Sequence, residues 1–107
     1  MTRVYIAGPM TGIEAFNYPA FNAEAARLRT LGYEVENPAE NPAPACGTWA
    51  GYMRLALSQM LRCDVVALLP GWAGSKGARI ERRIAGELDL AVVLAETITA
   101  PAEAVMV

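Results

Sequence analysis

Residues 65–81 read VVALLPGWAGSKGARIE and contain three local patterns in a fixed order. The apolar run Val65–Leu69 is typical of a buried β-strand, and it ends at Pro70-Gly71. A loop of small residues follows, and a helical pattern begins near Ser75, with Glu81 about two turns into it. This order places backbone N–H groups and one carboxylate around a cleft of the kind that binds small phosphorylated or sugar-bearing ligands.

The alternation of strand and helix extends through the rest of the chain. Further short apolar strands are expected at Val4–Ala7, Tyr33–Val35 and Ala91–Leu94. Helices are expected from Pro19 to a C-cap at Gly32, after an N-cap at Thr48, and from Ser75 to Leu88. Short, continuously apolar strands between helices indicate a parallel sheet that is covered on both faces, in a small doubly wound α/β fold.

The helical spacing of apolar residues predicts which side chains are buried. The first helix presents Phe21, Ala25, Leu28 and Leu31, and the third presents Ile80, Ile84 and Leu88. The second helix presents Trp49, Tyr52, Met53, Ala56, Met60 and Leu61. We interpret Trp49 and the methionines of that helix as core residues. The apolar tail after Thr97 forms either a fifth strand or a subunit contact, so the sheet has four or five strands.

The composition excludes several kinds of site. The chain of 107 residues has 9 basic and 11 acidic residues, so its charge does not indicate a nucleic-acid partner. The absence of histidine removes imidazole bases, Ser-His triads and histidine metal ligands, and we expect no metal or other cofactor. Cys46 and Cys63 are expected to be reduced, packed thiols. We expect one domain over residues 1–107, cytoplasmic, with no leader segment and no membrane partner.

Ligands of a parallel sheet bind beyond the carboxyl ends of its strands, and this rule separates the two acids near the third strand. Asp64 begins that strand, far from this edge, so we interpret it as structural. Glu81 lies near the edge and has two interpretations. It is a surface acid favoured by the helix dipole, or it is a nucleophile or ligand anchor that the dipole keeps ionised. Tyr5, near the end of the first strand, packs in the core or contributes to the site.

The residues of the glycine loop also have alternative roles. Trp72 stacks on a base of the ligand or anchors its loop, and Ser75 is a good N-cap. The local basic cluster consists of Lys76, Arg79, Arg82 and Arg83. It is either a solvated helix face or a group that places Lys76 or Arg79 against a phosphate.

Four segments of the chain resemble a known family. They are VYIAGPMTG (4–12), FNYPAF (16–21), NPAE (37–40) and the stretch from Cys63 to Glu81. Over nearly the whole chain they resemble a phage and bacterial family catalogued as domain of unknown function 4406. That family is similar to the nucleoside 2-deoxyribosyltransferases and the deoxynucleoside monophosphate N-glycosidases. The resemblance implies a flavodoxin-like parallel sheet and a homo-oligomer.

The resemblance to these enzymes also implies a reaction. In them a glutamate near the start of this helix attacks the anomeric carbon of deoxyribose, the base leaves, and a second base or water completes the exchange. Glu81 matches that glutamate, and Tyr5 matches a tyrosine that orients it. The loop Gly8–Gly12 matches the segment that holds the sugar or 5′-phosphate, and Ser75 replaces an acid that contacts the sugar. The substrate-binding residues implied in this way are Gly8, Pro9, Met10, Gly12, Asn17, Asn37, Gly71, Trp72, Ser75 and Gly77.

One position departs from the enzymes. Their aspartate that handles the proton of the base falls at Ala56 in this chain. General acid–base help is typically worth ~10²–10⁴-fold, so another residue or a neighbouring subunit replaces it, or the reaction is slow or absent. The nearest replacements are Glu14, Glu36 and Glu40.

Three functions are therefore expected in descending order. The first is an enzyme that cleaves or transfers the N-glycosidic bond of a (deoxy)nucleoside or its 5′-monophosphate. The second is a non-catalytic protein that binds or sequesters a nucleotide. The third is a small oligomerising protein with a vestigial cleft, because the apolar end of the tail, Ala104–Val107, needs cover.

Overall fold

A computed structural model describes residues 2–102 of the chain. Its four parallel strands are β1 (Arg3–Ala7), β2 (Glu34–Glu36), β3 (Val65–Leu68) and β4 (Ala91–Leu94), in the spatial order β2-β1-β3-β4. The helices are α1 (Tyr18–Thr30), α2 (Trp49–Met60) and α3 (Lys76–Glu87). Four short 3₁₀ segments are η1 (Glu14–Asn17), η2 (Pro38–Glu40), η3 (Trp72–Gly74) and η4 (Ala95–Thr97).

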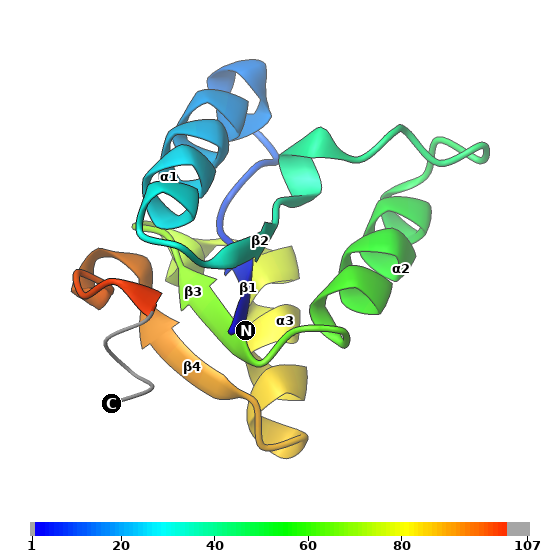
Figure 1. Cartoon of the computed structure of the whole chain (residues 1–107). Helices are drawn as coiled ribbons and strands as arrows, with labels where there is room; N and C mark the ends of the chain where they lie inside the picture. Colours follow the sequence, from blue (N-terminus) through cyan, green and yellow to red (C-terminus); the bar gives the residue numbers. More distant parts are fainter. Residues whose placement is uncertain (1, 103–107) are drawn as a thin grey trace.

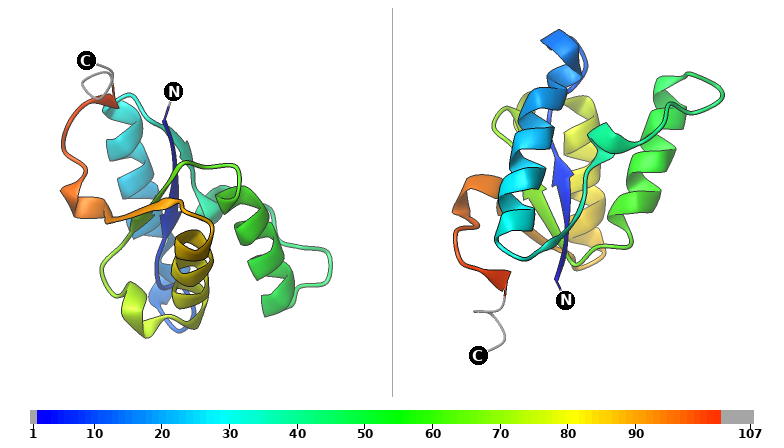
Figure 2. Two further views of the ribbon diagram at one scale, coloured as in Figure 1. Left: turned by 90° about the horizontal axis from the view of Figure 1, so that it is seen from below. Right: turned by 45° about the horizontal axis from the view of Figure 1, so that its top comes forward.

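Helices cover both faces of the sheet, which confirms the predicted doubly wound α/β class. Helix α1 lies on one face, and α2 and α3 lie on the other, as the left view of Figure 2 shows. Strands alternate with helices along the whole chain (Figure 1). The chain leaves β1 toward β2 on one side and returns to β3 on the other, so the topological switch point lies between β1 and β3.

The core consists of two apolar layers, because successive side chains of β1 point to opposite faces of the sheet. On one face Val4 and Ile6 pack with α1, whose buried residues are Phe21, Ala25 and Leu28. On the other face Tyr5 and Ala7 pack with residues of α2 and α3, namely Ala56, Met60 and Ala85. Burial of the first layer fixes α1, and burial of the second places α2 and α3 beside the switch point.

The predicted helix caps are confirmed. The Thr48 hydroxyl accepts a hydrogen bond from the Gly51 amide at 3.0 Å at the start of α2. The Ser75 hydroxyl accepts one from the Ala78 amide at 3.2 Å at the start of α3. Gly32 has φ +96° just after α1, in the left-handed conformation that favours glycine.

Several element boundaries differ by one residue from the prediction, and the end of α1 gives the reason for one of them. The Tyr33 amide donates to the Leu28 carbonyl at 3.2 Å, so Tyr33 belongs to the helix cap and β2 begins at Glu34. Strand β1 begins at Arg3, and β3 ends at Leu68. Residues 98–102 form no strand, and the rest of the tail, including Ala104–Val107, lies outside the described residues.

Five predictions of burial are wrong, and two of them concern Tyr52 and Leu61 of the second helix's apolar stripe, which are 44% and 52% exposed. Trp49 is 42% exposed and borders a cavity, because the first turn of α2 extends beyond the edge of the sheet. Leu88 is 56% exposed because it lies past the last turn of α3, where Ala85 has already filled the sheet-facing position. Cys46 is exposed in the loop before α2, whereas Cys63 is buried as expected.

Asp64 is confirmed as structural. Its carboxylate accepts a hydrogen bond from the Arg3 amide at 2.9 Å, which joins the start of β3 to the start of β1. Within residues 2–102, no helix has the length and apolar character needed to cross a membrane.

Candidate functional site

A cavity of about 1040 Å³ lies at the switch point, beyond the carboxyl ends of β1 and β3. Its walls come from the loops after β1 and β3, from η1, and from the first two turns of α2 and α3. Eight of the predicted site residues line it: Tyr5, Gly8, Pro9, Met10, Gly71, Ser75, Gly77 and Glu81. The position agrees with the rule that ligands of open α/β sheets bind at the switch point.

Glu81 forms part of the buried base of this cavity. It lies on the inward face of α3 between Ala78 and Ala85 and is only 5% exposed, so the interpretation as a surface acid is wrong. The Tyr5 hydroxyl, on β1, donates a hydrogen bond to Oε2 of the Glu81 carboxylate. Tyr5 therefore belongs to both of its predicted environments, because its ring packs in the core and its hydroxyl faces the acid.

The electrostatic environment of Glu81 differs from the expectation. Burial raises the pKa of Glu81 from 4.5 to about 7, and the hydrogen bond from Tyr5 opposes this shift only in part. The helix dipole acts within the first turn, and Glu81 lies beyond that turn of α3. The carboxyl is therefore divided between its two protonation states at neutral pH. Burial, followed by the charge of Glu81, raises the pKa of Tyr5 well above 10, so the phenol remains a donor.

Two glycines allow the walls of the cavity to approach one another. A Cβ at Gly8 would lie 2.8 Å from Cβ of Leu69, so only glycine lets the loop after β1 pass beside the end of β3. A Cβ at Gly77 would lie 3.1 Å from the Met53 sulfur, which brings the first turn of α3 against α2. Gly8 and Gly77 therefore line the cavity, and close packing also explains why each of these positions is a glycine.

Comparison with family models identifies the chain. The model for a domain of unknown function, DUF4406, matches residues 2–94, a range that includes every residue that lines the cavity. The chain belongs to this family. A search among curated proteins found no match.

Four predicted substrate-binding residues of this DUF4406 chain do not line the cavity: Gly12, Asn17, Asn37 and Trp72. They support the surrounding loops instead. The side-chain Nδ2 of Asn17 donates to the Pro9 carbonyl at 3.0 Å, and the side-chain Oδ1 of Asn37 accepts from the Ala39 backbone amide at 3.1 Å. Trp72 packs against the core of the sheet, with the Arg82 guanidinium 5.8 Å from its ring centre, while Gly12 forms an exposed turn.

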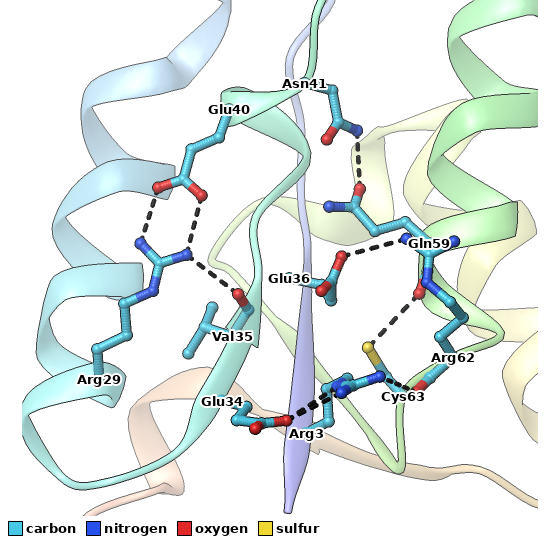
Figure 3. A network of polar contacts seen from close by, with 10 residues as sticks. All are labelled: Arg3, Arg29, Glu34, Val35, Glu36, Glu40, Asn41, Gln59, Arg62 and Cys63. Carbon is cyan, nitrogen blue, oxygen red and sulfur yellow. Dashed lines mark hydrogen bonds and ion pairs between the residues drawn. The ribbon is translucent and has the colours of Figure 1, made fainter.

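The second carboxylate expected from glycosidase chemistry is not replaced within the described residues. Ala56 lines the cavity and packs in the same cluster as Tyr5, so the position at which the resemblance implies an acid faces this site. Glu36 instead pairs with Arg62 and Glu40 with Arg29, at 3.4 Å and 2.7 Å (Figure 3).

Those two ion pairs lie along β2 and η2 and not in the cavity. Glu14 is exposed in η1 and does not line the cavity either. The three acids named as nearest replacements are therefore wrong. Among residues 2–102, Glu81 is the one carboxylate that lines the cavity.

Sequence reasoning missed an aromatic and apolar part of the cavity wall. It consists of Ile13, Phe16, Tyr18, Trp49, Tyr52 and Leu55. Helical spacing could not separate Trp49 and Tyr52 from core residues, because α2 presents one continuous apolar stripe to both the sheet and the cavity. The Lys76 ammonium lies 4.5 Å from the ring centre of Trp49, and Lys76 also lines the cavity. Arg79, the other predicted phosphate ligand, donates to the Ala73 carbonyl at 3.0 Å.

Backbone strain is concentrated beside this wall. Ala15, Phe16 and Asn17 are consecutive residues with φ of 54°, 53° and 61°. Each such conformation typically costs about 1–3 kcal/mol in a residue other than glycine, and strain of this kind is common at functional sites. Asn17 is of a residue type that tolerates this conformation, but nothing in the sequence predicts it for Ala15 and Phe16.

The remaining polar groups limit the chemistry available. Within residues 2–102, no cluster of three or more Cys, Asp or Glu side chains is placed to hold a metal ion. The cavity combines one buried carboxyl, backbone amides at the start of α3, and a broad apolar wall. This arrangement can direct a carboxylate oxygen at an electrophilic carbon of a ligand that is held by the two loops.

Proposed function

We propose that this protein cleaves or transfers the N-glycosidic bond of a deoxynucleoside or its 5′-monophosphate, with Glu81 as the nucleophile. The observation that carries the proposal is the buried Glu81 carboxyl, held by the Tyr5 hydroxyl at the base of the cavity. The resemblance of the loop 8–12 and the segment 63–81 to the deoxyribosyltransferases and N-glycosidases supports the choice of reaction.

The proposed reaction has two steps. A carboxylate oxygen of Glu81 attacks C1′ of the sugar, the C1′–N bond breaks, and its electron pair leaves with the base nitrogen, which takes a proton. Water or a second base then attacks C1′ and releases the carboxylate, while the attacking group loses its proton. Tyr5 donates to Oε2, which leaves Oε1 of Glu81 for the attack.

Different walls of the cavity would bind different parts of the substrate. The loop that contains Gly8, Pro9 and Met10 would hold the sugar. The start of α3 offers the amides of Lys76 and Gly77 to a sugar oxygen or a 5′-phosphate, because helix N-termini favour negative charge. The Ser75 hydroxyl already caps the helix, and its other lone pair remains for the ligand.

Ala56 favours a second candidate function, that of a protein that binds a nucleotide without turning it over. A methyl group cannot transfer a proton to the leaving base, and no other carboxyl among the described residues lines the cavity. On this alternative, the same loops bind the nucleotide and Glu81 contributes only a hydrogen bond.

Base release separates the two candidates. The pure protein is incubated at high concentration with the deoxynucleosides and their 5′-monophosphates, and free base is measured by chromatography. We expect release by the wild type and by Glu87→Gln, a control at the exposed end of α3, and loss of release in Glu81→Gln.

Absence of base release from every substrate would reject the enzymatic proposal. Tight nucleotide binding in the same samples, measured by calorimetry, would then support the second candidate. Base release that persists unchanged in Glu81→Gln would show that Glu81 is not the nucleophile, while the proposed reaction itself would still stand.

A further inference from the structure

The mouth of the cavity has an apolar rim, which consists of Ile13, Phe16, Trp49, Tyr52 and Leu55. Each of these side chains is between 40% and 60% exposed. They are five of the eight large apolar side chains that are exposed within residues 2–102. Large apolar side chains gathered at one cavity mark a binding surface and not ordinary surface variation.

The two sides of the apolar rim are held in place. On α2, the Trp49 ring lies under the Lys76 ammonium, 4.5 Å from the ring centre, and 3.8 Å from the point that a Cβ of Gly77 would occupy. On η1, the left-handed conformations of Ala15, Phe16 and Asn17 fix where Phe16 projects, and the Asn17 side chain ties this segment to the Pro9 carbonyl. Preformed aromatic surfaces of this kind suit a flat, apolar ligand group.

The cavity is also large for a ligand site. Its volume of about 1040 Å³ lies just above the range of roughly 300–1,000 Å³ for sites of drug-sized ligands. Ala56 adds only a methyl group to the part of the wall that α2 supplies. An unsubstituted base, which is recognised through hydrogen bonds to its polar edge, would leave the apolar rim exposed to solvent.

We infer that the leaving group of the substrate is a nucleobase with a bulky apolar substituent, which packs against the apolar rim. The inference rests on the proposed function, because it names the substrate class of the same site. Glu81 acts on the sugar, the start of α3 faces its polar end, and the substituted base extends toward α2 and η1. Recognition of the base then depends on stacking and apolar burial and not on hydrogen bonds to its edge.

Binding to the Glu81→Gln variant tests the inference without turnover. The probes are 2′-deoxyguanosine against O6-benzyl-2′-deoxyguanosine, and 2′-deoxyuridine against 5-phenyl-2′-deoxyuridine, each also as the 5′-monophosphate. We expect the substituted member of at least one pair to bind at least tenfold more tightly. Tyr52→Ala in the same background should abolish that preference, whereas Leu61→Ala, an exposed leucine at the C-cap of α2 outside the cavity, should retain it.

Leu55→Ala is measured in parallel as a smaller change in the same rim, and thermal unfolding confirms that each variant is folded. Equal binding within every pair, no binding of any probe, or a preference that survives Tyr52→Ala would overturn the inference. Sedimentation is the other check. If Tyr52→Ala weakens self-association and leaves the ligand preference unchanged, the apolar rim is a contact with a second copy of the chain. That result would also overturn the inference.

The failure of the proposed function is distinguishable from the failure of this inference. Wild-type protein is assayed for base release from the same probes. Release without any preference for the substituted base supports the reaction and overturns the inference. A tenfold binding preference without release supports the apolar rim as a ligand site and rejects the reaction.

Discussion

The Glu81 carboxyl is subject to two opposing effects. Burial between α3 and β1 disfavours its charge, and the Tyr5 hydroxyl favours that charge through a hydrogen bond. Burial is the stronger effect and raises the pKa of Glu81 to about 7. A nucleophile must be ionised, so the residue proposed to react is poised within the physiological range of pH.

The pKa of Glu81 predicts the pH dependence of base release. Because the ionised form attacks, kcat/KM should rise about tenfold per pH unit below 7 and level off above it. Initial rates measured between pH 5 and pH 9 check this, in buffers of constant ionic strength. A rate that stays level from pH 5 to pH 7 would show that Glu81 does not act as the proposed nucleophile.

Tyr5→Phe should move that profile to higher pH. The substitution keeps the buried ring and removes the donor, which now lowers the pKa of Glu81. A hydrogen bond to a charged group contributes about 1.5–3 kcal/mol, which corresponds to a shift of about one to two pH units. Tyr33→Phe is the matched control, because that hydroxyl donates to the Ala100 carbonyl at the other side of the molecule. An unmoved profile in Tyr5→Phe would exclude the proposed positioning.

The same pKa makes a prediction about stability. The folded protein binds the Glu81 proton more tightly than the unfolded chain does, since the pKa is about 7 in the fold against 4.5. The stabilising contribution of the protonated carboxyl is complete below pH 4.5 and is lost as pH rises through 7.

Glu81→Gln removes this titration and keeps a similar shape. Relative to the wild type, it should gain up to about 3 kcal/mol between pH 5 and pH 8 in the free energy of unfolding. Urea unfolding at the two pH values measures it. An equal difference between the two proteins at both pH values would contradict the raised pKa.

At the scale of elements, the segment η1 stores strain that a substitution can release. Ala15 has φ 54°, a conformation that glycine adopts without the Cβ clash. Ala15→Gly should therefore stabilise the protein by roughly 0.5–1 kcal/mol in urea unfolding. Ala23→Gly is the control, because Ala23 is exposed within α1, where glycine costs about 1 kcal/mol. Destabilisation by Ala15→Gly to the same extent as by Ala23→Gly would contradict the strained geometry.

The elements that sequence predicts well are those specified by local chemistry. Thr48 and Ser75 cap their helices as predicted, because a hydroxyl before a helical pattern satisfies an amide of the first turn wherever the helix packs. The pairing of Tyr5 with Glu81 followed from a resemblance, and its burial could not be read from spacing. An acid on an amphipathic helix looks the same whether the turn that carries it faces solvent or a cavity.

Helix α2 shows where local pattern fails. Met60 and Trp49 belong to one apolar stripe, yet Met60 is fully buried under the sheet and Trp49 borders the cavity. The difference depends on where the sheet ends beneath the helix, which is a tertiary property. The left-handed conformations of Ala15 and Phe16 could not be predicted either, because alanine and phenylalanine carry no local signal for that conformation.

For the whole molecule, strand order places the two site loops side by side. Strands β1 and β3 are neighbours in the sheet, although 57 residues separate Ala7 from Val65 in the sequence. Those residues include one helix on each face of the sheet, α1 and α2. The loops that follow β1 and β3 therefore meet at the switch point. The buried acid reaches this point because α3 follows β3 directly. The site is therefore a product of the parallel topology and not of any single motif.

Self-association is the prediction that belongs to the molecule as a whole. We expect a homo-oligomer in solution, because the sequence Ala104–Val107 at the end of the chain is apolar throughout. Light scattering at working concentration measures the mass directly. A monodisperse monomer of 11.4 kDa would reject this expectation.

The central claim is that Glu81 forms a bond to the sugar, and mass spectrometry of that bond is its most direct test. A 2′-fluoroarabinosyl nucleoside suits the trap, because the electron-withdrawing fluorine destabilises the oxocarbenium-like transition state through which the glycosyl ester breaks down. After rapid quenching and digestion, the account predicts one added fluorosugar on the peptide that contains Glu81, and none in Glu81→Gln. Base release without an adduct on Glu81, or with the adduct on another residue, would contradict it.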